Sequence, residues 1–226
     1  MLREDSLAAE VRTARESLPA RYAGRTVLAI GAHPDDLELG AGGTLARLVR
    51  AGARVVMAVV SVPGDYERRL AEARAAAAIL GCELRILLEG GRRIDDVKPY
   101  QLVGMLDEQV RELAPAAVIS HSAHEFHGDH VAVHAATMAA QRVRFFDSFA
   151  YHPTMTRPLP VAFHPRAYVD ISDAIDEKIA AIAAHRSQFE GRERDPEMFR
   201  DFARINGRLI GVQYAEGLDV GRMLLA

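Results

Sequence analysis

The stretch Thr26-Val27-Leu28-Ala29-Ile30-Gly31-Ala32-His33-Pro34-Asp35-Asp36 joins a continuous apolar run to a polar cluster. The apolar part is too short for a helix and rich in β-forming residues, so it predicts a strand that is buried on both faces. Gly31 and Ala32 allow a tight turn, and Pro34 stiffens the chain that leaves this turn. The polar side chains therefore follow the carboxyl end of a buried strand, where open α/β sheets bind their ligands.

The rest of the chain alternates strand-like and helix-like segments, which is typical of a mainly parallel sheet with helices on both faces. With 226 residues, the chain is long enough to bury a large core. We therefore expect a single α/β, Rossmann-like domain over residues 25–226, with residues 1–24 as an N-terminal packing helix. The expected strands are 26–30, 54–61, 84–88, 116–120 and 167–170, and the expected helices are 66–80, 99–113, one from 130, and one from 170 or 172 to about 189.

The polar cluster after the first strand has the residues of a metal site. His33 and Asp36 are three residues apart in a turn, a spacing that lets both side chains reach one ion. Asp35 points to a different side, where a carboxylate can take a proton from water next to the ion. Asp35-Asp36 taken alone is equally consistent with the start of a helix. The histidine directly upstream favours the metal site.

A second cluster follows the strand expected at 116–120, and residues 121–130 contain four of the nine histidines. His130 begins a helical pattern, and this helix would fix its ring as a metal ligand. His127 lies in the preceding loop and would reach the same pocket. We expect Asp129 to accept a hydrogen bond from a ring N–H, as carboxylates behind metal ligands usually do.

The remaining histidines of this part of the chain are His134, His121 and His124. His134 lies one helical turn beyond His130, and a structural role on the helix face, or a contact behind a ligand, is favoured for it. His121 and His124 are equally consistent with solvated loop residues and with members of the site.

Together, the two motifs resemble those of the PIG-L/LmbE-like family of metal-dependent de-N-acetylases, which deacetylate N-acetylglucosamine conjugates. The family's Ala-His-Pro-Asp-Asp signature is intact at 32–36, and its His-Pro-Asp-His signature reads His127-Gly128-Asp129-His130 here. Gly128 replaces the usual proline and frees the backbone beside His127, but no catalytic side chain is lost. Further matches, which extend the resemblance over roughly residues 25–217, lie at 40–44, 69–72, 80–81, 170–172 and 178–188.

The resemblance implies an LmbE-like deacetylase domain that removes the N-acetyl group of an N-acetylglucosamine-type conjugate, a linear amide. It implies Asp35 as the general base, His127 as the electrostatic or acid partner, and Arg69 as a substrate contact. His127, if protonated, would stabilise the oxyanion, and either Asp35 or His127 would protonate the leaving amine. The metal would be Zn²⁺, with another divalent ion such as Fe²⁺ possible, and its protein ligands would be His33, Asp36 and His130.

Three alternatives are open. The same site fits a hydrolase of a non-sugar acyl amide. Two histidines and one carboxylate also form the facial triad of non-haem Fe(II) oxygenases, although Asp35 has no function in that chemistry. The glycines at 40–43 suggest a nucleotide-binding module, but the acidic segment before them does not fit the dinucleotide fingerprint. We expect these glycines instead to let a helix pack closely on the sheet.

Composition excludes several classes of protein. The net charge is −3, and no cluster of basic residues indicates nucleic-acid binding. No apolar run approaches the ~18 residues of a membrane span. The N-terminal segment lacks the apolar core of a signal peptide, and the single Cys82 rules out a disulfide within the chain. We therefore expect a cytoplasmic enzyme whose partner is a small-molecule amino-sugar conjugate, and which could form a homo-oligomer.

Overall fold

A seven-stranded sheet forms the centre of the computed structural model, which describes residues 17–153, 163–192 and 195–225. The strand order is β3-β2-β1-β4-β5-β7-β6. Strands β1 to β5 are parallel to one another, whereas β7 is antiparallel to both β5 and β6. The strands are β1 Thr26–Gly31, β2 Arg54–Ser61, β3 Glu83–Leu88, β4 Ala117–His121, β5 Asp147–Tyr151, β6 Ala167–Asp170 and β7 Ala215–Arg222.

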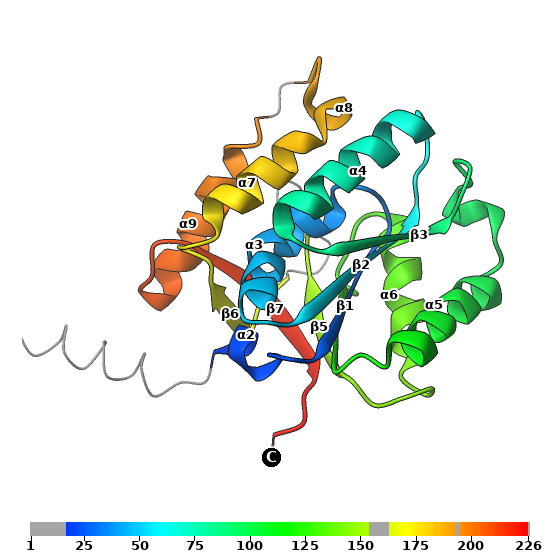
Figure 1. The fold of residues 1–226 in the computed structure, drawn as a ribbon, viewed down its shortest axis with the longest axis horizontal. Coiled ribbons are helices and arrows are strands. Elements are labelled where there is room, and N and C mark those ends of the chain that lie inside the picture. Colours follow the sequence, from blue (N-terminus) through cyan, green and yellow to red (C-terminus); the bar gives the residue numbers. More distant parts are fainter. Residues whose placement is uncertain (1–16, 154–162, 193–194, 226) are drawn as a thin grey trace, which may run out of the picture.

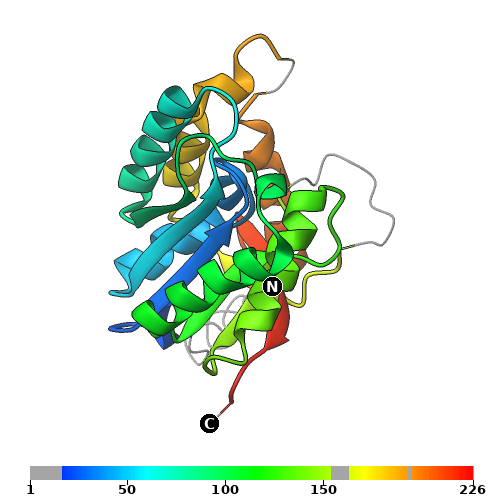
Figure 2. The ribbon, with the colours of Figure 1, turned by 90° about the vertical axis from the view of Figure 1, so that its right-hand side faces the viewer.

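Helices cover both faces of this sheet (Figures 1 and 2), which confirms the expected α/β class and mainly parallel sheet. Helices α3, α4, α7 and α9 pack on one face, and α5 and α6 on the other. None of the helices in the described ranges is long and apolar enough to cross a membrane. The helices are α2 Leu18–Arg21, α3 Asp36–Arg50, α4 Tyr66–Leu80, α5 Pro99–Leu113, α6 Gly128–Ala140, α7 Ile175–Ala184, α8 Arg186–Phe189 and α9 Met198–Ile210, with the 3-10 turn η1 at Ile94–Asp96.

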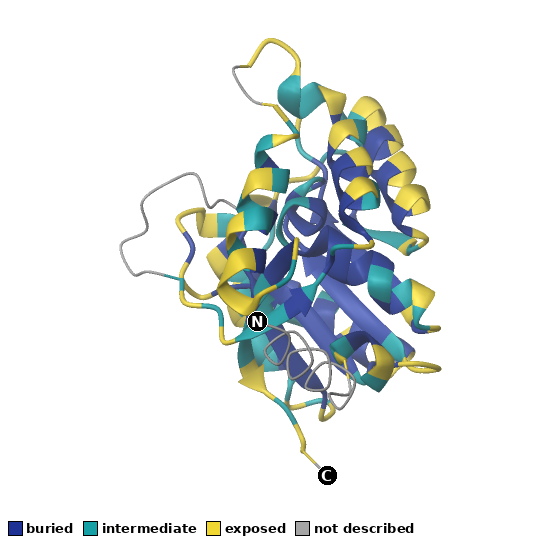
Figure 3. Cartoon of the chain, turned by 90° about the vertical axis from the view of Figure 1, so that its left-hand side faces the viewer, coloured by how far each residue is buried: buried dark blue, intermediate teal, exposed yellow. Residues whose placement is uncertain are grey.

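The central strands are buried on both sides, as the apolar run at the start of the chain predicted. Along β1, Val27 and Ala29 belong to the core under α3, whereas Leu28 and Ile30 belong to the core under α5 and α6. Figure 3 shows this burial as dark blue strands between helices whose outer faces are exposed. Two apolar layers therefore hold the sheet in place, one on each face.

The strand order explains why two motifs far apart in the sequence meet. Strand β1 pairs with β2 on one side and with β4 on the other. The chain builds β2 and β3 on one side of β1 and returns with β4 on its other side, so the connections leaving β1 and β4 diverge. Such a switch point opens a crevice at the carboxyl ends of the two strands. The segments after Gly31 and after His121 enter this crevice.

The glycines at positions 40–43 lie inside α3 and make room for close packing. A Cβ atom at Gly40 would lie 2.1 Å from the Tyr151 ring, and one at Gly43 would lie 2.8 Å from Ile171. Neither neighbour can move away, because both Tyr151 and Ile171 are fully buried. The glycines thus have the packing role that we expected for them.

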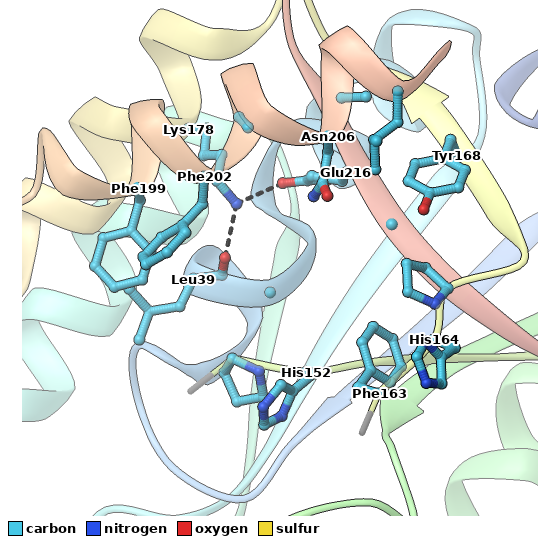
Figure 4. A pocket seen from close by; sticks show the side chains of 17 residues that line it. Leu39, His152, Phe163, His164, Tyr168, Lys178, Phe199, Phe202, Asn206 and Glu216 are labelled. Carbon is cyan, nitrogen blue, oxygen red and sulfur yellow. Dashed lines mark hydrogen bonds and ion pairs between the residues drawn. The ribbon is translucent and has the colours of Figure 1, made fainter. Parts of the chain in front are cut away.

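A buried ion pair between Lys178 and Glu216 contacts the backbone of α3 (Figure 4). Lys178 of α7 donates to Glu216 of β7 over 2.5 Å and also to two main-chain carbonyls of α3. Glu216 accepts hydrogen bonds from two main-chain amides of the same helix. Lys178 therefore donates to backbone carbonyls of α3, and Glu216 accepts from backbone amides of the same helix. These backbone partners are the carbonyls of Glu38 (3.1 Å) and Leu39 (2.8 Å) and the amides of Gly43 (2.9 Å) and Thr44 (2.7 Å).

One expected helix was wrong in its extent. Instead of one helix from residue 170 or 172 to about 189, the structure has α7 from Ile175 and then the short α8. His185 separates them with a non-helical ψ of 57°, and its Nε2 lies 3.0 Å from Glu38 Oε1 in the core. Neither expected cap is used, because Asp170 Oδ1 accepts from the Ser172 amide and hydroxyl instead.

The N-terminal packing helix expected over residues 1–24 falls largely outside the described residues, which begin at position 17. Within the described part, the short α2 begins at Leu18, and Tyr22 directly after it is 1% exposed. The Tyr22 hydroxyl donates to Asp147 Oδ2 over 2.8 Å. The boundary between residues 1–24 and 25–226 stays a prediction.

Candidate metal-dependent active site

The turn between β1 and α3 carries three of the expected site residues. The His33 amide donates to Asp36 Oδ2 over 2.8 Å, which closes the turn at the first residue of α3. Asp35 lies between them with a φ of 94°. This left-handed conformation is unfavourable for a residue with a Cβ atom, and aspartate is among the few types that adopt it. Strained backbone of this kind occurs preferentially at functional sites.

Three side chains converge in a geometry that fits a divalent metal. Ligand atoms of His33, Asp36 and His130 all lie within 4.8 Å of one another. His130 Nε2 is 3.3 Å from Asp36 Oδ1, and His33 Nδ1 is 3.8 Å from Asp36 Oδ2. Two donors on a tetrahedral zinc ion are about 3.3 Å apart, because each lies about 2.0–2.1 Å from the ion. The nitrogen and oxygen donors present therefore suit Zn²⁺ or a related ion.

A carboxylate stands behind His33. Asp129 Oδ2 lies 2.9 Å from His33 Nε2, and this hydrogen bond lowers the pKa of the Asp129 carboxyl. With Nε2 occupied, the Nδ1 atom of His33 is left for a metal. Carboxylates in this position set the ring orientation of a ligating histidine and raise its basicity.

A second carboxylate, Glu125, stands behind His130 and was missed in the sequence. Glu125 Oε2 is 3.3 Å from His130 Nδ1, and Oε1 is 2.6 Å from His152 Nδ1. All three side chains are buried. Burial alone would raise the pKa of Glu125, but hydrogen bonds with His130 and His152 overcome it and lower the pKa to about 2. In the sequence, Glu125 lies in a polar loop and gives no sign of this burial.

Replacing Glu125 by glutamine should weaken metal binding by about 10–100-fold. The neutral amide loses the negative charge that orients the His130 ring and raises its basicity. Competition with a chromophoric chelator measures the metal dissociation constant. The matched control is Glu89→Gln at an exposed position, which should leave metal affinity unchanged. Equal affinities for Glu125→Gln and the control would contradict the role given to Glu125.

His121 supports the site from behind. Its Nε2 accepts a hydrogen bond from the Ala32 amide over 2.9 Å, and its ring stacks on His130 with centroids 4.0 Å apart. Burial lowers the pKa of His121 to about 4 despite the neighbouring Asp36, so the ring is neutral. His134 Nδ1 lies 2.8 Å from the main-chain carbonyl of His121. These contacts give His121 and His134 structural positions, whereas His124 is exposed.

His127 lies at the N-terminus of α6 and faces the same site. Its Nδ1 accepts a hydrogen bond from the Asp129 amide over 3.2 Å, and its ring stacks on His130 at 4.7 Å. Burial lowers the pKa of His127, and the neighbouring His130 and His33 lower it further. With Nδ1 accepting from the Asp129 amide, Nε2 is the ring nitrogen left to face the site. A proton on Nε2 could be donated to an oxyanion, so the role expected for His127 stays a prediction.

Asp35 and Arg69 line a cavity of about 390 Å³ together with the three metal-binding candidates. Burial raises the pKa of the Asp35 carboxyl, and the charge of Asp36 raises it further. Arg69 donates to the carbonyls of Pro63 (2.8 Å) and Pro34 (3.3 Å). It therefore braces the turn that carries His33, and its expected contact with substrate stays a prediction. All seven expected site residues line this one cavity: His33, Asp35, Asp36, Arg69, His127, Asp129 and His130.

Two histidines and an aspartate beside a further carboxylate form the side-chain set of a metal-dependent hydrolase. Residues 28–141 match the model of the PIG-L family, described as GlcNAc-PI de-N-acetylase, and the chain belongs to this family. The resemblance seen in the two His/Asp motifs is thereby confirmed.

Named relatives point to the same class of enzyme. YaiS of Escherichia coli strain K12, an uncharacterized deacetylase, is 32% identical over 173 residues, which are 71% of this chain and 90% of YaiS. Diacetylchitobiose deacetylase of Thermococcus kodakarensis is 29% identical over 86% of this chain and 82% of its own length. The protein is a metal-dependent N-deacetylase, and neither the oxygenase nor the non-sugar amidase alternative is favoured.

A solved structure agrees with the fold. The conserved protein TT1542 from Thermus thermophilus superimposes with a TM-score of 0.76 and is 30% identical. The match covers 89% of this chain and 97% of TT1542. Nearly the whole described chain therefore follows the architecture of this structure.

Proposed function

We propose that the protein hydrolyses the acetamide of an N-acetylglucosamine-type conjugate, using Zn²⁺ held by His33, Asp36 and His130. The observation that carries this proposal is the convergence of these three side chains with a fourth, Asp35, in one cavity. The name of the Thermococcus relative, diacetylchitobiose deacetylase, supports an N-acetylated amino sugar as the substrate.

Each residue of the site has its own role in the proposed reaction. A bound divalent ion supplies Lewis acidity, which lowers the pKa of water towards ~7 and polarises the amide carbonyl. Asp35 accepts the proton of the attacking water, a role that its raised pKa suits. His127 donates its Nε2 proton in a hydrogen bond to the oxygen on which negative charge develops. Since His127 Nδ1 accepts from the Asp129 amide and Nε2 donates to the oxyanion, we assign delivery of the proton to the leaving amine to Asp35, which received it from water.

Product analysis tests the proposal. Protein loaded with Zn²⁺ is incubated with a panel of N-acetylglucosamine conjugates and, in parallel, with N-acetyl amino acids. We expect equimolar acetate and primary amine from the sugar conjugates. Release of acetate from the N-acetyl amino acids alone would show that the enzyme hydrolyses non-sugar amides instead. No release from either panel by protein with stoichiometric metal would contradict the proposed reaction.

The identity of the metal is part of the same proposal. Mixed nitrogen and oxygen donors suit Zn²⁺ and also Fe²⁺, so the donor set alone does not choose between them. We infer Zn²⁺ and expect anaerobic reconstitution with Zn²⁺ to give full deacetylase activity. Activity with Fe²⁺ alone would contradict this inference. A cytoplasmic location and a homo-oligomeric state stay predictions from the sequence.

A further inference from the structure

An exposed phenyl ring lies at the wall of the metal-binding cavity. Phe126 is 61% exposed, and it is one of the residues that line this cavity. Among the described residues of the cavity wall, no other side chain has a phenyl or phenol ring. A single exposed apolar side chain is ordinary on a protein surface. Phe126 differs from such residues because it lies beside the groups expected to carry the reaction.

Contacts of both neighbouring residues hold the backbone of Phe126 in place. Glu125 is buried between His130 and His152, and the Phe126 amide donates to Glu125 Oε2 over 3.2 Å. His127, on the other side, caps helix α6 and stacks on His130 with ring centroids 4.7 Å apart. Both neighbours thus contact a metal-binding candidate, while the Phe126 side chain stays exposed.

The Phe126 ring offers an open apolar face in a largely polar cavity. It forms no stacking or cation–π contact with any described residue. Beyond the metal-binding group, the cavity wall includes the polar side chains of Arg69, Arg93, Gln188 and Arg192. Ligand sites commonly combine apolar surface with a few polar groups that fix orientation. A pyranose matches this mixture, because its hydroxyls surround an apolar patch of C–H groups on the ring face.

The proposed reaction brings a sugar ring close to Phe126. His127 would donate to the oxygen of the acetamide, and the amide nitrogen is bonded directly to C2 of the pyranose. Adjacent Cα atoms are about 3.8 Å apart, so Phe126 leaves the backbone next to the residue that binds the acetamide. A sugar ring joined to that acetamide therefore comes within reach of the Phe126 side chain.

We propose that the Phe126 ring stacks on the apolar face of the substrate's pyranose and is thereby a substrate-binding residue. The inference rests on the proposed function, because the acetamide must lie at the metal for the sugar ring to reach Phe126. Stacking removes apolar surface of both rings from water, and the flat face of the phenyl ring gives the contact its geometry.

Binding is measured separately from turnover in metal-loaded Asp35→Asn protein. This protein is titrated with the methyl glycoside of N-acetylglucosamine by isothermal calorimetry. Adding Phe126→Ala should raise the Kd of the glycoside by about tenfold. Phe126→Tyr keeps the aromatic face and should keep the Kd within about twofold. Phe126→Leu keeps an apolar side chain without a flat face and should raise the Kd by at least about threefold.

The matched control is Phe145→Ala. Phe145 is also an exposed phenylalanine, and it lies outside the metal-binding cavity. This variant should leave the Kd of the glycoside unchanged. In the active enzyme, Phe126→Ala should raise KM by about the same factor as Kd, with kcat within about twofold.

Several outcomes would overturn the proposal. They are equal Kd values for Phe126→Ala and Phe145→Ala, equal values for Phe126→Leu and Phe126→Tyr, or no measurable binding of the glycoside to Asp35→Asn. A changed oligomeric state of Phe126→Ala at an unchanged Kd would assign the ring to a contact between subunits and would also overturn it. If the Kd values follow the expected pattern but the wild type releases no amine, the stacking contact stands and the proposed function fails.

Discussion

Asp35→Asn should retain the metal and lose turnover by about 10²–10⁴-fold, the usual contribution of one acid–base group. Asp36→Asn should instead lose the metal, because Asp36 Oδ1 lies 3.3 Å from His130 Nε2 in the metal-binding group. Both carboxylates come from one turn, yet only Asp36 belongs to the group of three possible ligands. The two variants therefore separate the base from the ligand.

The measurements are kcat at saturating substrate and metal content by elemental analysis of the purified variants. Asp201→Asn, on the exposed surface of α9, is the matched control and should behave as wild type. Equal metal loss in Asp35→Asn and Asp36→Asn would contradict the division of roles.

The pH profile gives an independent check of the base. Asp35 accepts a proton only when it is ionised, so the wild-type kcat/KM should fall as the pH drops through the pKa of Asp35. The residual activity of Asp35→Asn should lack this acidic limb. An unchanged limb in the variant would assign the titration to another group.

Lys178→Met should have the largest effect on stability. It leaves Glu216 buried without its cation, and breaking a buried pair in this way typically costs about 3–5 kcal/mol. Because Glu216 also accepts two amide hydrogen bonds of α3, the charge cannot turn away to solvent without losing them. Unfolding in urea, followed by circular dichroism, measures the change in free energy of unfolding.

An exposed ion pair provides the comparison. Arg54→Met removes the partner of Glu83 at the surface and should cost no more than about 1 kcal/mol. The double variant Lys178→Met/Glu216→Gln should recover part of the lost stability, because the unpaired charge is gone. If Lys178→Met destabilises the protein no more than Arg54→Met, the buried pair does not hold α3 in place.

This ion pair links stability to the site. Helix α3 begins at Asp36, and its next two turns are held by Lys178, Glu216 and the close contacts at Gly40 and Gly43. Metal-binding residues need rigid support, since a ligand displaced by a fraction of an ångström loses its geometry. We infer that the glycines and the buried pair serve the placement of Asp36.

The features predicted well from the sequence are local ones. The apolar run of β1, the turn at 31–36 and the helix after it follow from neighbouring residues. The convergence of His33 with His130 also follows, because both motifs come after strands of one parallel sheet, whose carboxyl ends lie at the same edge. Local pattern and sheet topology placed the two motifs together, and the family resemblance named His33, Asp36 and His130 as the metal-binding candidates.

The features that were missed depend on distant contacts. Glu125 lies between His130 and His152, and the chain after β5 brings His152 to it. The break between α7 and α8 arises because His185 pairs with Glu38, 147 positions earlier. Neither contact leaves a periodic signal in the sequence. Helix α9 is amphipathic and could have been expected from its sequence, whereas the antiparallel β7 lies in a segment with glycines that weaken a strand pattern.

The most direct test of the account is the position of the metal. Among the described residues, three groups of side chains are able to hold an ion. One group contains both His33 and His130, and each of the other two contains only one of these histidines. Anomalous diffraction at the zinc edge from a zinc-loaded crystal locates the ion. We predict one site bound by His33, Asp36 and His130, with ligand distances of about 2.0–2.2 Å. An ion held instead by His33, His127 and Asp129, or by His121, Glu125 and His130, would contradict the account, because Asp36 would no longer be a ligand.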